Sequence, residues 1–369
     1  MCLGWFEPTA TKGTTKFGGA GLCSSNSKVF DDLPERAKNT MKELGNFGLS
    51  QKTWGSYRTA QKMWTLCQDQ TGSALPLPWS QRETIIFIDW LVNDRKVKSA
   101  TINTYLAGIK KVHILQGFDE PKLKTTLIKQ LIKGKHNMEL NKRYLTDDHG
   151  RLPVTITTLK LIKEKLRQSD RNIENKLLIW SVATIAFFGG VRIHEILSQT
   201  ESSYDPNFTL LEQNIRVTEY KNGTETTKVL EVLIKCPKES KTGKDVVLDI
   251  FEIAGGLCPI KAFTRWRSRS VTTGRGGPAF REEDGTPLTG RKFNAYLKEL
   301  LSDIVDYKKE KITSHSFRAG LATLLATNGV SIGEIKIAGR WNSRSYEKYV
   351  KLPRAQRSLL AQKLGSIVN

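Results

Sequence analysis

Several residue types that handle phosphate lie close together near the end of the chain. The segment HSFRAGLATLLATNGVSIGEIKIAGRWNSRSYEKYV, residues 315–350, holds a histidine, an arginine three residues after it, a tryptophan and two tyrosines. A second arginine, Arg192 in FFGGVRIHEIL, lies upstream, and the lysine-rich segment KESKTGKD lies between them. The guanidinium of arginine can donate two parallel hydrogen bonds to two oxygens of one phosphate. A tyrosine that has lost its proton can attack phosphorus. Together these residues suggest strand-exchange chemistry on DNA.

Arg192 and Arg318 are the two side chains that we expect to bind the reacting phosphate. A phosphodiester undergoing transesterification gains negative charge on its non-bridging oxygens, so an enzyme without a metal needs fixed cations around them. A guanidinium is always charged and binds two of these oxygens at once, which lysine cannot do. Removal of one such donor typically raises the barrier by about 3 to 4 kcal/mol.

His315 and Glu195 are placed to assist the two arginines. His315 precedes Arg318 by three residues, so both side chains share one helix face and can approach the same phosphate. That spacing alone is common on solvated helix faces and gains meaning only from the other residues. Glu195 follows Arg192 by three residues and either braces that arginine or a nearby histidine, or merely stabilises its helix.

Trp341 and Tyr349 complete the expected set around the phosphate. The indole N–H of Trp341 can donate one hydrogen bond to a phosphate oxygen, although it cannot transfer a proton. Tyr349 is the candidate nucleophile, and its phenol needs proton removal and nearby cations because it is almost fully protonated at neutral pH. Tyr346, three residues earlier, is the rival nucleophile.

A lysine in the segment KESKTGKD is the candidate general acid. The leaving 5′ oxygen must be protonated, and a lysine on a flexible turn can reach it. Lys241 is our first choice, and its neighbours Lys238 and Lys244 are alternatives. A run of lysines in a hairpin is also typical of a solvated or DNA-facing turn.

Composition favours nucleic acid as the partner. The 369 residues carry a formal net charge of +21, which attracts polyanions. The five cysteines are scattered without a CxxC pair, so we expect reduced intracellular thiols and no structural zinc. No apolar run approaches the roughly 18 residues of a membrane span, and no signal peptide is evident. We therefore expect a cytosolic or nuclear protein without a membrane partner or a small-molecule substrate.

The first half of the chain is expected to form a mobile arm followed by a helical domain. Residues 1–33 are rich in glycine, threonine and serine and lack periodicity. Residues 34–136 repeat apolar residues at helical spacing, which predicts a bundle of four or five helices. Residues 137–152 are polar and end near Pro153, so we expect a linker there.

The helical domain carries the residues that we expect to contact the DNA backbone. Its lysines, and hydroxyl and amide groups near a helix start, can meet phosphates. The predicted DNA-binding residues are Lys96, Lys98, Thr101, Lys110, Lys111, Lys133 and Lys135.

The second domain is expected to span residues 153–352 and to combine helices with a small sheet. Helices are predicted over residues 159–166 and 177–188, after Pro259, and around His315 and Ile332. NIRVTEY, KVLEVLIKC and DVVLDI alternate as strands and predict a small antiparallel sheet. The fold class is therefore mostly α with a small antiparallel β-sheet (α+β). Residues 353–369 form a last amphipathic stretch.

These residues, in this order, resemble the tyrosine recombinase and integrase family. The resemblance rests on Arg192 with Glu195, a lysine in SKTGK, the phrases HSFR and GRW, and then Tyr349; it covers about residues 50–352. Supporting phrases are SATINTYLAGIKKVH in the first domain, and LCPIKAFTRW and GTPLTGRKFNAYLKELL in the second. The ending GRWNSRSYEKYVK looks most like eukaryotic mobile-element recombinases of the Crypton or DIRS-like groups.

The resemblance implies a fold, a mechanism and an assembly. It implies a C-shaped clamp around double-stranded DNA, made of a helical, SAM-like core-binding domain and a catalytic domain. It implies a 3′-phosphotyrosyl intermediate without metal, ATP or other cofactor, and a homotetramer that exchanges strands through a Holliday junction. On this analogy residues 353–369 dock onto a neighbouring protomer, although packing within the same chain is the simpler reading. A eukaryotic member would act in the nucleus.

Two departures from the family pattern bear on the residue assignments. Many members have histidine where Trp341 stands, so a donor role is retained here but an acid–base role is not. The tyrosine commonly follows that position by nine residues, whereas Tyr349 follows by eight and Tyr346 by five. We favour Tyr349 because the phrase EKYVK matches the family's ending better.

Two alternatives remain beside a recombinase. One is a non-catalytic DNA-binding protein descended from such an enzyme, which the loss of an arginine or of the tyrosine would have favoured. The other is a relaxing type IB topoisomerase, which uses the same chemistry without synapsis. The DNA target, the direction of reaction and the host cannot be read from the sequence.

Overall fold

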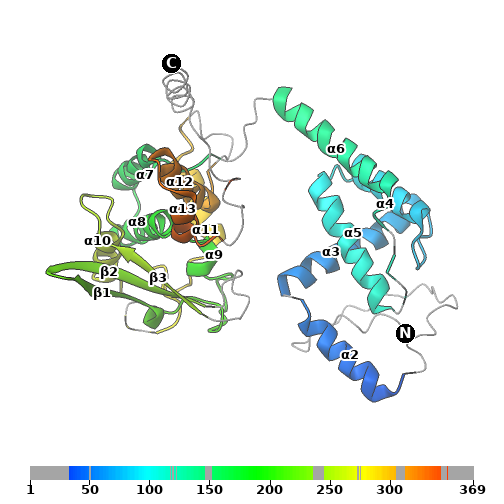
Figure 1. The fold of residues 1–369 in the computed structure, drawn as a ribbon, viewed down its shortest axis with the longest axis horizontal. Helices are drawn as coiled ribbons and strands as arrows, with labels where there is room; N and C mark the ends of the chain where they lie inside the picture. Colours follow the sequence, from blue (N-terminus) through cyan, green and yellow to red (C-terminus); the bar gives the residue numbers. More distant parts are fainter. Residues whose placement is uncertain are drawn as a thin grey trace. The chain divides into compact units, whose positions relative to one another are not determined.

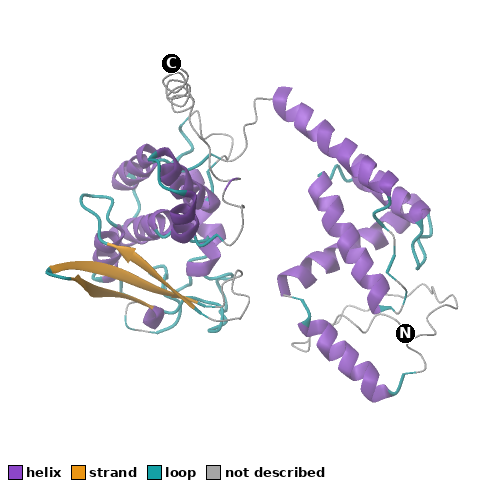
Figure 2. Cartoon of the chain, in the orientation of Figure 1, coloured by secondary structure: helices purple, strands orange, loops and turns teal. Residues whose placement is uncertain are grey.

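The computed structural model describes residues 33–49, 51–116, 118, 120–121, 123–145, 152–235, 245–271, 274, 276–304, 312–341 and 347. The chain divides into two compact units, and the division falls between Asp148 and His149. Helices dominate both units (Figure 1), and the described strands form one small antiparallel sheet in the second unit (Figure 2). The predicted α+β fold class is therefore confirmed. None of the described helices combines the length and the apolar character needed to cross a membrane.

The first unit is a helical bundle, as the apolar periodicity predicted. Its described helices are α2 (Glu35–Phe47), α3 (Gln51–Thr71), α4 (Gln81–Asn93), α5 (Ser99–Leu115) and α6 (Thr126–Leu145). Helix α3 packs against α5 and α4, and α6 packs against the same two helices. The apolar faces meet in one core, in which Phe87, Leu91, Ile102 and Ile109 are fully buried.

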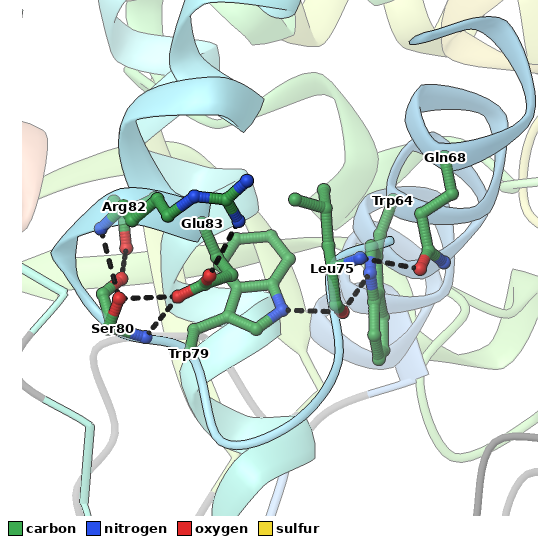
Figure 3. Close-up of polar contacts among 8 residues, drawn as sticks. Trp64, Gln68, Leu75, Trp79, Ser80, Arg82 and Glu83 are labelled. Carbon is green, nitrogen blue, oxygen red and sulfur yellow. Dashed lines mark hydrogen bonds and ion pairs between the residues drawn. The ribbon is translucent and has the colours of Figure 1, made fainter. Parts of the chain in front are cut away.

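The connection between α3 and α4 is held by side chains that satisfy the backbone of Leu75 (Figure 3). The Leu75 carbonyl accepts hydrogen bonds from the indole nitrogens of Trp64 (3.1 Å) and Trp79 (3.2 Å). Its N–H donates to the Gln68 side-chain oxygen at 3.0 Å. Because a buried backbone group without a partner is costly, these bonds fix an otherwise irregular segment against the core.

A capping box begins helix α4 (Figure 3). The hydroxyl of Ser80 accepts a hydrogen bond from the N–H of Arg82 at 3.1 Å, and the Glu83 carboxylate accepts one from the N–H of Ser80 at 2.8 Å. These bonds satisfy donors that the first turn of a helix leaves without partners. The helix therefore starts at a fixed residue.

Helix α6 corrects the expected start of the linker. It continues to Leu145, so the first nine residues of the predicted linker 137–152 are helical. The segment from Asn137 reads NMELNKRYL, and methionine, glutamate, leucine, lysine and arginine are good helix formers. Polar composition was mistaken for a loop signal.

The second unit surrounds one apolar helix. Its described helices are α7 (Ile156–Gln168), α8 (Ile173–Phe188), α9 (Ile193–Ile196), the 3-10 turn η2 (Glu212–Asn214), α10 (Pro259–Arg267), α11 (Gly290–Leu300), α12 (Ser314–Thr327) and α13 (Ile332–Gly339). Helix α8 is apolar on all sides and is buried from Leu177 to Phe187. Helices α7, α10 and α12 pack around it. Its carboxyl end is therefore a rigid base for the residues that follow.

The predicted three-stranded sheet is confirmed. Strands β1 (Ile215–Asn222), β2 (Glu225–Ile234) and β3 (Val246–Phe251) pair antiparallel in the order β1-β2-β3. Val232 lies opposite Ile215 on one side and Leu248 on the other, so the buried residues of the strands share one face. That face packs on helix α10.

Candidate functional site

Arg192 stands on a tight turn between helices α8 and α9. Helix α8 ends at Phe188, and Gly190 takes a positive φ of 53° before Arg192 begins helix α9. A Cβ on Gly190 would lie 2.8 Å from a methyl carbon of Leu321, so this position needs glycine for both conformation and space. The sequence Gly189-Gly190 therefore forms the turn that leads from α8 to Arg192.

Arg318 is held at the same turn. It lies on α12, its residue is only 1% exposed, and its Nη1 donates to the carbonyl of Gly190 at 2.5 Å. Gly190 precedes Arg192 by two residues. The fold thus brings the Arg318 guanidinium to the turn that precedes Arg192, although the two residues are far apart in the sequence.

The indole ring of Trp341 lies against the Arg318 guanidinium. The Arg318 Cζ is 4.6 Å from the centroid of the ring, which is a cation–π distance. Trp341 is buried and packs with Ala322 and Ile335 in a small apolar cluster. Trp341 therefore contacts Arg318 through stacking, and its predicted hydrogen bond to phosphate stays a prediction.

Glu195 bridges two arginines. Its Oε2 accepts a hydrogen bond from the Arg192 N–H at 2.8 Å, and its Oε1 accepts one from Arg192 Nη1 at 3.2 Å. The Nη2 of Arg340 donates to Oε2 at 2.7 Å. Glu195 thus contacts the Arg192 side chain, and its bond to the Arg192 N–H also caps helix α9, so the geometry fits both the brace of Arg192 and the stabilisation of its helix.

The carboxylate of Glu195 is buried but remains ionised. Burial by itself would raise its pKa, but the charge and hydrogen bond of Arg340 lower it, with further contributions from the Arg192 N–H and charge. The net pKa lies below the usual value of a glutamate. The site therefore holds a fixed negative charge between two positive ones.

Arg340 is a residue to which the sequence analysis gave no role. It caps helix α13 in the left-handed conformation, with φ 53° and ψ 48°. This region costs a non-glycine residue about 1 to 2 kcal/mol. A charged residue at a helix end where glycine is usual, directly before Trp341, was the signal that could have identified it.

His315 lies at the first turn of helix α12. Its residue is exposed, whereas Arg318, one turn later, is buried. His315 is therefore exposed on the same helix that carries the buried guanidinium. Lys241, its alternatives Lys238 and Lys244, and both tyrosines, Tyr349 and Tyr346, lie outside the described residues. The lysine-bearing segment follows the end of strand β2 at Ile234 and precedes the start of strand β3 at Val246.

The predicted DNA-binding residues lie on or next to helices α5 and α6 of the first unit. Lys96, Lys98 and Lys133 are exposed, and Thr101, Lys110, Lys111 and Lys135 are half-buried. Lys110 forms an ion pair with Glu120.

A basic pocket of about 390 Å³ lies where α6 meets the start of α5. Its lining includes Lys124, Lys129, Lys133 and His136, of which only Lys133 belongs to the predicted DNA-binding residues. Ser99 also lines it, but its N–H and hydroxyl donate to the Glu139 carboxylate at 2.8 and 2.9 Å. Ser99 is therefore already hydrogen-bonded within the protein, and the lysines supply the positive charge of the pocket.

Solved structures share this fold, although no protein-family model and no curated protein matches the sequence. The XerH site-specific recombinase bound to palindromic difH substrate is 12% identical with a TM-score of 0.54, over 88% of this chain and 83% of that chain. The Tn1549 transposon integrase in complex with a circular intermediate DNA is 14% identical with a TM-score of 0.54, over 88% and 97%. The chain therefore has the fold of the tyrosine recombinases and integrases. These names do not bear on the Crypton or DIRS-like groups, so that subgroup stays a prediction.

Proposed function

We propose that the chain is a site-specific DNA recombinase or integrase that cuts and rejoins strands through a 3′-phosphotyrosyl intermediate. The observation that carries the proposal is a set of contacts around one turn of the second unit. Arg192 pairs with Glu195, and Arg318 binds the carbonyl of Gly190 and stacks on Trp341. Two arginines at one point provide the fixed positive charge that a pentacoordinate phosphate needs. The fold supports the same assignment, because both neighbours above were solved with DNA.

Each residue of the set has a separate task in the proposed reaction. Arg192 and Arg318 bind the non-bridging oxygens, and the Trp341 indole donates a further hydrogen bond. The phenolate oxygen of Tyr349 attacks phosphorus and forms a new O–P bond, while the bond from phosphorus to the 5′ oxygen breaks.

Proton transfers complete the step. Lys241 gives its proton to the departing 5′ oxygen, and His315 assists the loss of the tyrosine proton. Attack of a 5′ hydroxyl on the phosphotyrosine reverses these events and rejoins a strand. The energy of the broken bond is kept in the intermediate, so the proposed reaction needs neither ATP nor a metal.

The assembly around this site follows from the same assignment. Residues 34–145, which include all of α6, form the core-binding domain and residues 153–352 the catalytic domain of a clamp on duplex DNA. Residues 353–369 dock on a neighbouring protomer, and four protomers exchange strands between two sites. Integration or excision of a mobile element is the biological role that this chemistry fits.

The test uses a library of nicked suicide duplexes that are randomised in sequence, so that no single guess of the target decides the result. Wild type, Tyr349→Phe and Tyr346→Phe are incubated with the library without added metal or ATP. Protein–DNA adducts that survive denaturation are recovered and sequenced. We expect adducts with wild type and Tyr346→Phe, and none with Tyr349→Phe.

The other outcomes are equally informative. If the adduct were lost only in Tyr346→Phe, the chain would still be a recombinase, but Tyr346 would be its nucleophile. Binding without any adduct would identify a non-catalytic DNA-binding protein. Adducts that relax supercoiled DNA but never join two duplexes would identify a topoisomerase.

A further inference from the structure

We propose that Arg340 is a positioning residue for Arg192 and acts through the carboxylate of Glu195. This inference rests on the proposed function, because the group that Arg192 positions is the reacting phosphate. It adds to the proposed site a third arginine, which does not itself touch the substrate.

Arg340 has a left-handed backbone conformation that glycine adopts without steric cost. Its N–H donates to the carbonyl of Ile337 at 3.0 Å, and the next N–H, of Trp341, donates to the carbonyl of Lys336 at 2.9 Å. These bonds end helix α13 in the usual way for a left-handed residue, a position in which glycine has no steric cost. Among the described residues, Lys96 is the one other non-glycine with positive φ. The arginine side chain must therefore supply the advantage.

That side chain reaches a residue 145 positions away. Its Nη2 lies 2.7 Å from Oε2 of Glu195, whose side chain is only 4% exposed. The same oxygen accepts the N–H of Arg192, and the other oxygen holds Arg192 Nη1 at 3.2 Å. Arg340 thus fixes one oxygen of the carboxylate while the other oxygen orients the guanidinium that is to bind phosphate.

Charge gives Arg340 a second effect on the same group. If Arg340 were absent, the negative charge of Glu195 would cancel the positive charge of Arg192, and the pair would attract a phosphate only weakly. Arg340 compensates Glu195, so the three groups together keep one net positive charge. In a site with little water such a charge acts strongly on a developing anion.

The contact also joins two parts of the site. Arg340 directly precedes Trp341, whose ring stacks on Arg318. The turn that carries Trp341 is therefore tied to the helix that carries Arg192. A shift of about 1 Å in such an arrangement can slow a reaction by roughly 10²-fold.

The first experiment separates the side chain from the backbone. Arg340→Gly keeps the left-handed turn and removes the guanidinium, whereas Arg340→Lys keeps the charge. Single-turnover formation of the covalent adduct is measured at saturating nicked DNA, together with the affinity for the same DNA. We expect Arg340→Gly to bind DNA within about threefold of wild type and to cleave about 10²-fold more slowly, and Arg340→Lys to recover at least about tenfold of the rate.

The pH profile distinguishes positioning from a loss of structure. In Arg340→Gly the Glu195 carboxylate takes up a proton more readily, so as the pH is lowered cleavage should begin to fall at a higher pH than in wild type. Arg281→Gln is the matched control. Arg281 is another largely buried arginine of the second unit, and its Nη2 lies 3.1 Å from Oε2 of Glu212 rather than near Glu195. Its replacement should leave the pH profile of cleavage unchanged.

A second measurement does not depend on activity. The carboxyl carbon of Glu195 is titrated by NMR in the full-length chain, with Glu195→Gln for assignment. We expect a higher pKa of Glu195 in Arg340→Gly than in wild type, and no change in Arg281→Gln. An unmoved pKa would overturn the proposal whatever the activity, and so would a moved pKa with cleavage at the wild-type rate.

A failure of the proposed function itself gives a different result. If wild type forms no adduct while the titration still shows the shift, the proposed reaction is lost and with it the positioning role. The ion pair between Arg340 and Glu195 would then be structural.

Discussion

The Arg318 guanidinium lies between the carbonyl of Gly190, to which it donates at 2.5 Å, and the ring of Trp341, whose centroid is 4.6 Å from its Cζ. The two contacts restrict the guanidinium, and both come from residues just after a helix, Gly190 after α8 and Trp341 after α13. Since a buried guanidinium has little freedom here, Arg318 is held in place before any phosphate arrives. Such preorganisation is the main way in which charged groups lower a barrier.

The donor role of Trp341 can be separated from its stacking role. Trp341→Phe keeps a ring for Arg318 but removes the N–H, whereas Trp341→His keeps a ring nitrogen that can donate. We expect Trp341→Phe to bind DNA normally and to form the covalent adduct about 10²-fold more slowly, and Trp341→His to retain more of the rate. Single-turnover cleavage checks this. If Trp341→Phe and Trp341→His cleaved at the same rate, the indole N–H would have no donor role, and Trp341 would act only by stacking on Arg318.

Gly339 and Gly333 of helix α13 should respond in opposite ways to alanine. A Cβ on Gly339 would lie 1.7 Å from a ring carbon of Trp341, whereas the nearest atom to one on Gly333 is 3.9 Å away. Gly339→Ala must therefore displace the indole, and we expect it to destabilise the second unit by about 1 to 3 kcal/mol and to slow cleavage. Gly333→Ala should raise stability by up to about 0.5 to 1 kcal/mol because glycine weakens a helix.

Chemical denaturation followed by tryptophan fluorescence compares these two glycine variants. A destabilised Gly333→Ala, or a fully stable Gly339→Ala, would contradict the packing of Trp341 described above.

The predicted DNA contacts can be ranked by the salt dependence of binding. Lys133 lines the basic pocket of the first unit, whereas Lys110 already pairs with Glu120. Each phosphate contact contributes about 0.9 to the slope of log affinity against log salt. We expect Lys133→Ala to lower the slope by close to one, and Lys110→Ala to lower it by clearly less.

Fluorescence anisotropy with duplex DNA between low and moderate salt measures both slopes. Equal slopes in the two variants would mean that Lys110 exchanges Glu120 for phosphate on binding.

The buried imidazole of His113 should make the first unit sensitive to acid. Its Nε2 accepts the N–H of Trp79 at 2.7 Å, so Nδ1, which lies 2.8 Å from the carbonyl of Ile109, must carry the proton of a neutral ring. Burial lowers the pKa of His113 from its usual value, and the hydrogen bond to Ile109 offsets this only in part. The unfolded chain therefore takes up a proton at a higher pH than the folded chain does.

Folding should consequently weaken as the pH falls below about 6.5, by at most about 1.4 kcal/mol for each pH unit, and the loss should end below the folded pKa. Hydrogen exchange of the amides of α5 between pH 8 and pH 5, corrected for intrinsic rates, follows this locally. His113→Gln has no titrating ring and should lack the extra loss of protection. The same loss in both proteins would rule out His113 as its source.

Local patterns in the sequence predicted most of the elements. The apolar period of 3.6 residues located helices such as α5 and α8, and alternation located the three strands, because both patterns depend only on near neighbours. The same reasoning failed at α6, where polar residues such as Asn137 and Glu139 are on a helix that continues to Leu145. Polarity marks exposure to solvent, and an exposed helix is as polar as a loop.

The sequence by itself determined which reactive groups the chain carries and in what order, from Arg192 through Arg318 to Trp341, and that order supported the resemblance to recombinases. Only the tertiary structure decided how these groups meet: that Arg318 stacks on Trp341 and that Glu195 is shared by Arg192 and Arg340. The physical reason is distance along the chain. Glu195 and Arg340 are 145 residues apart, and their contact depends on how α12 packs on α8 and α13 on α12, which no local period encodes.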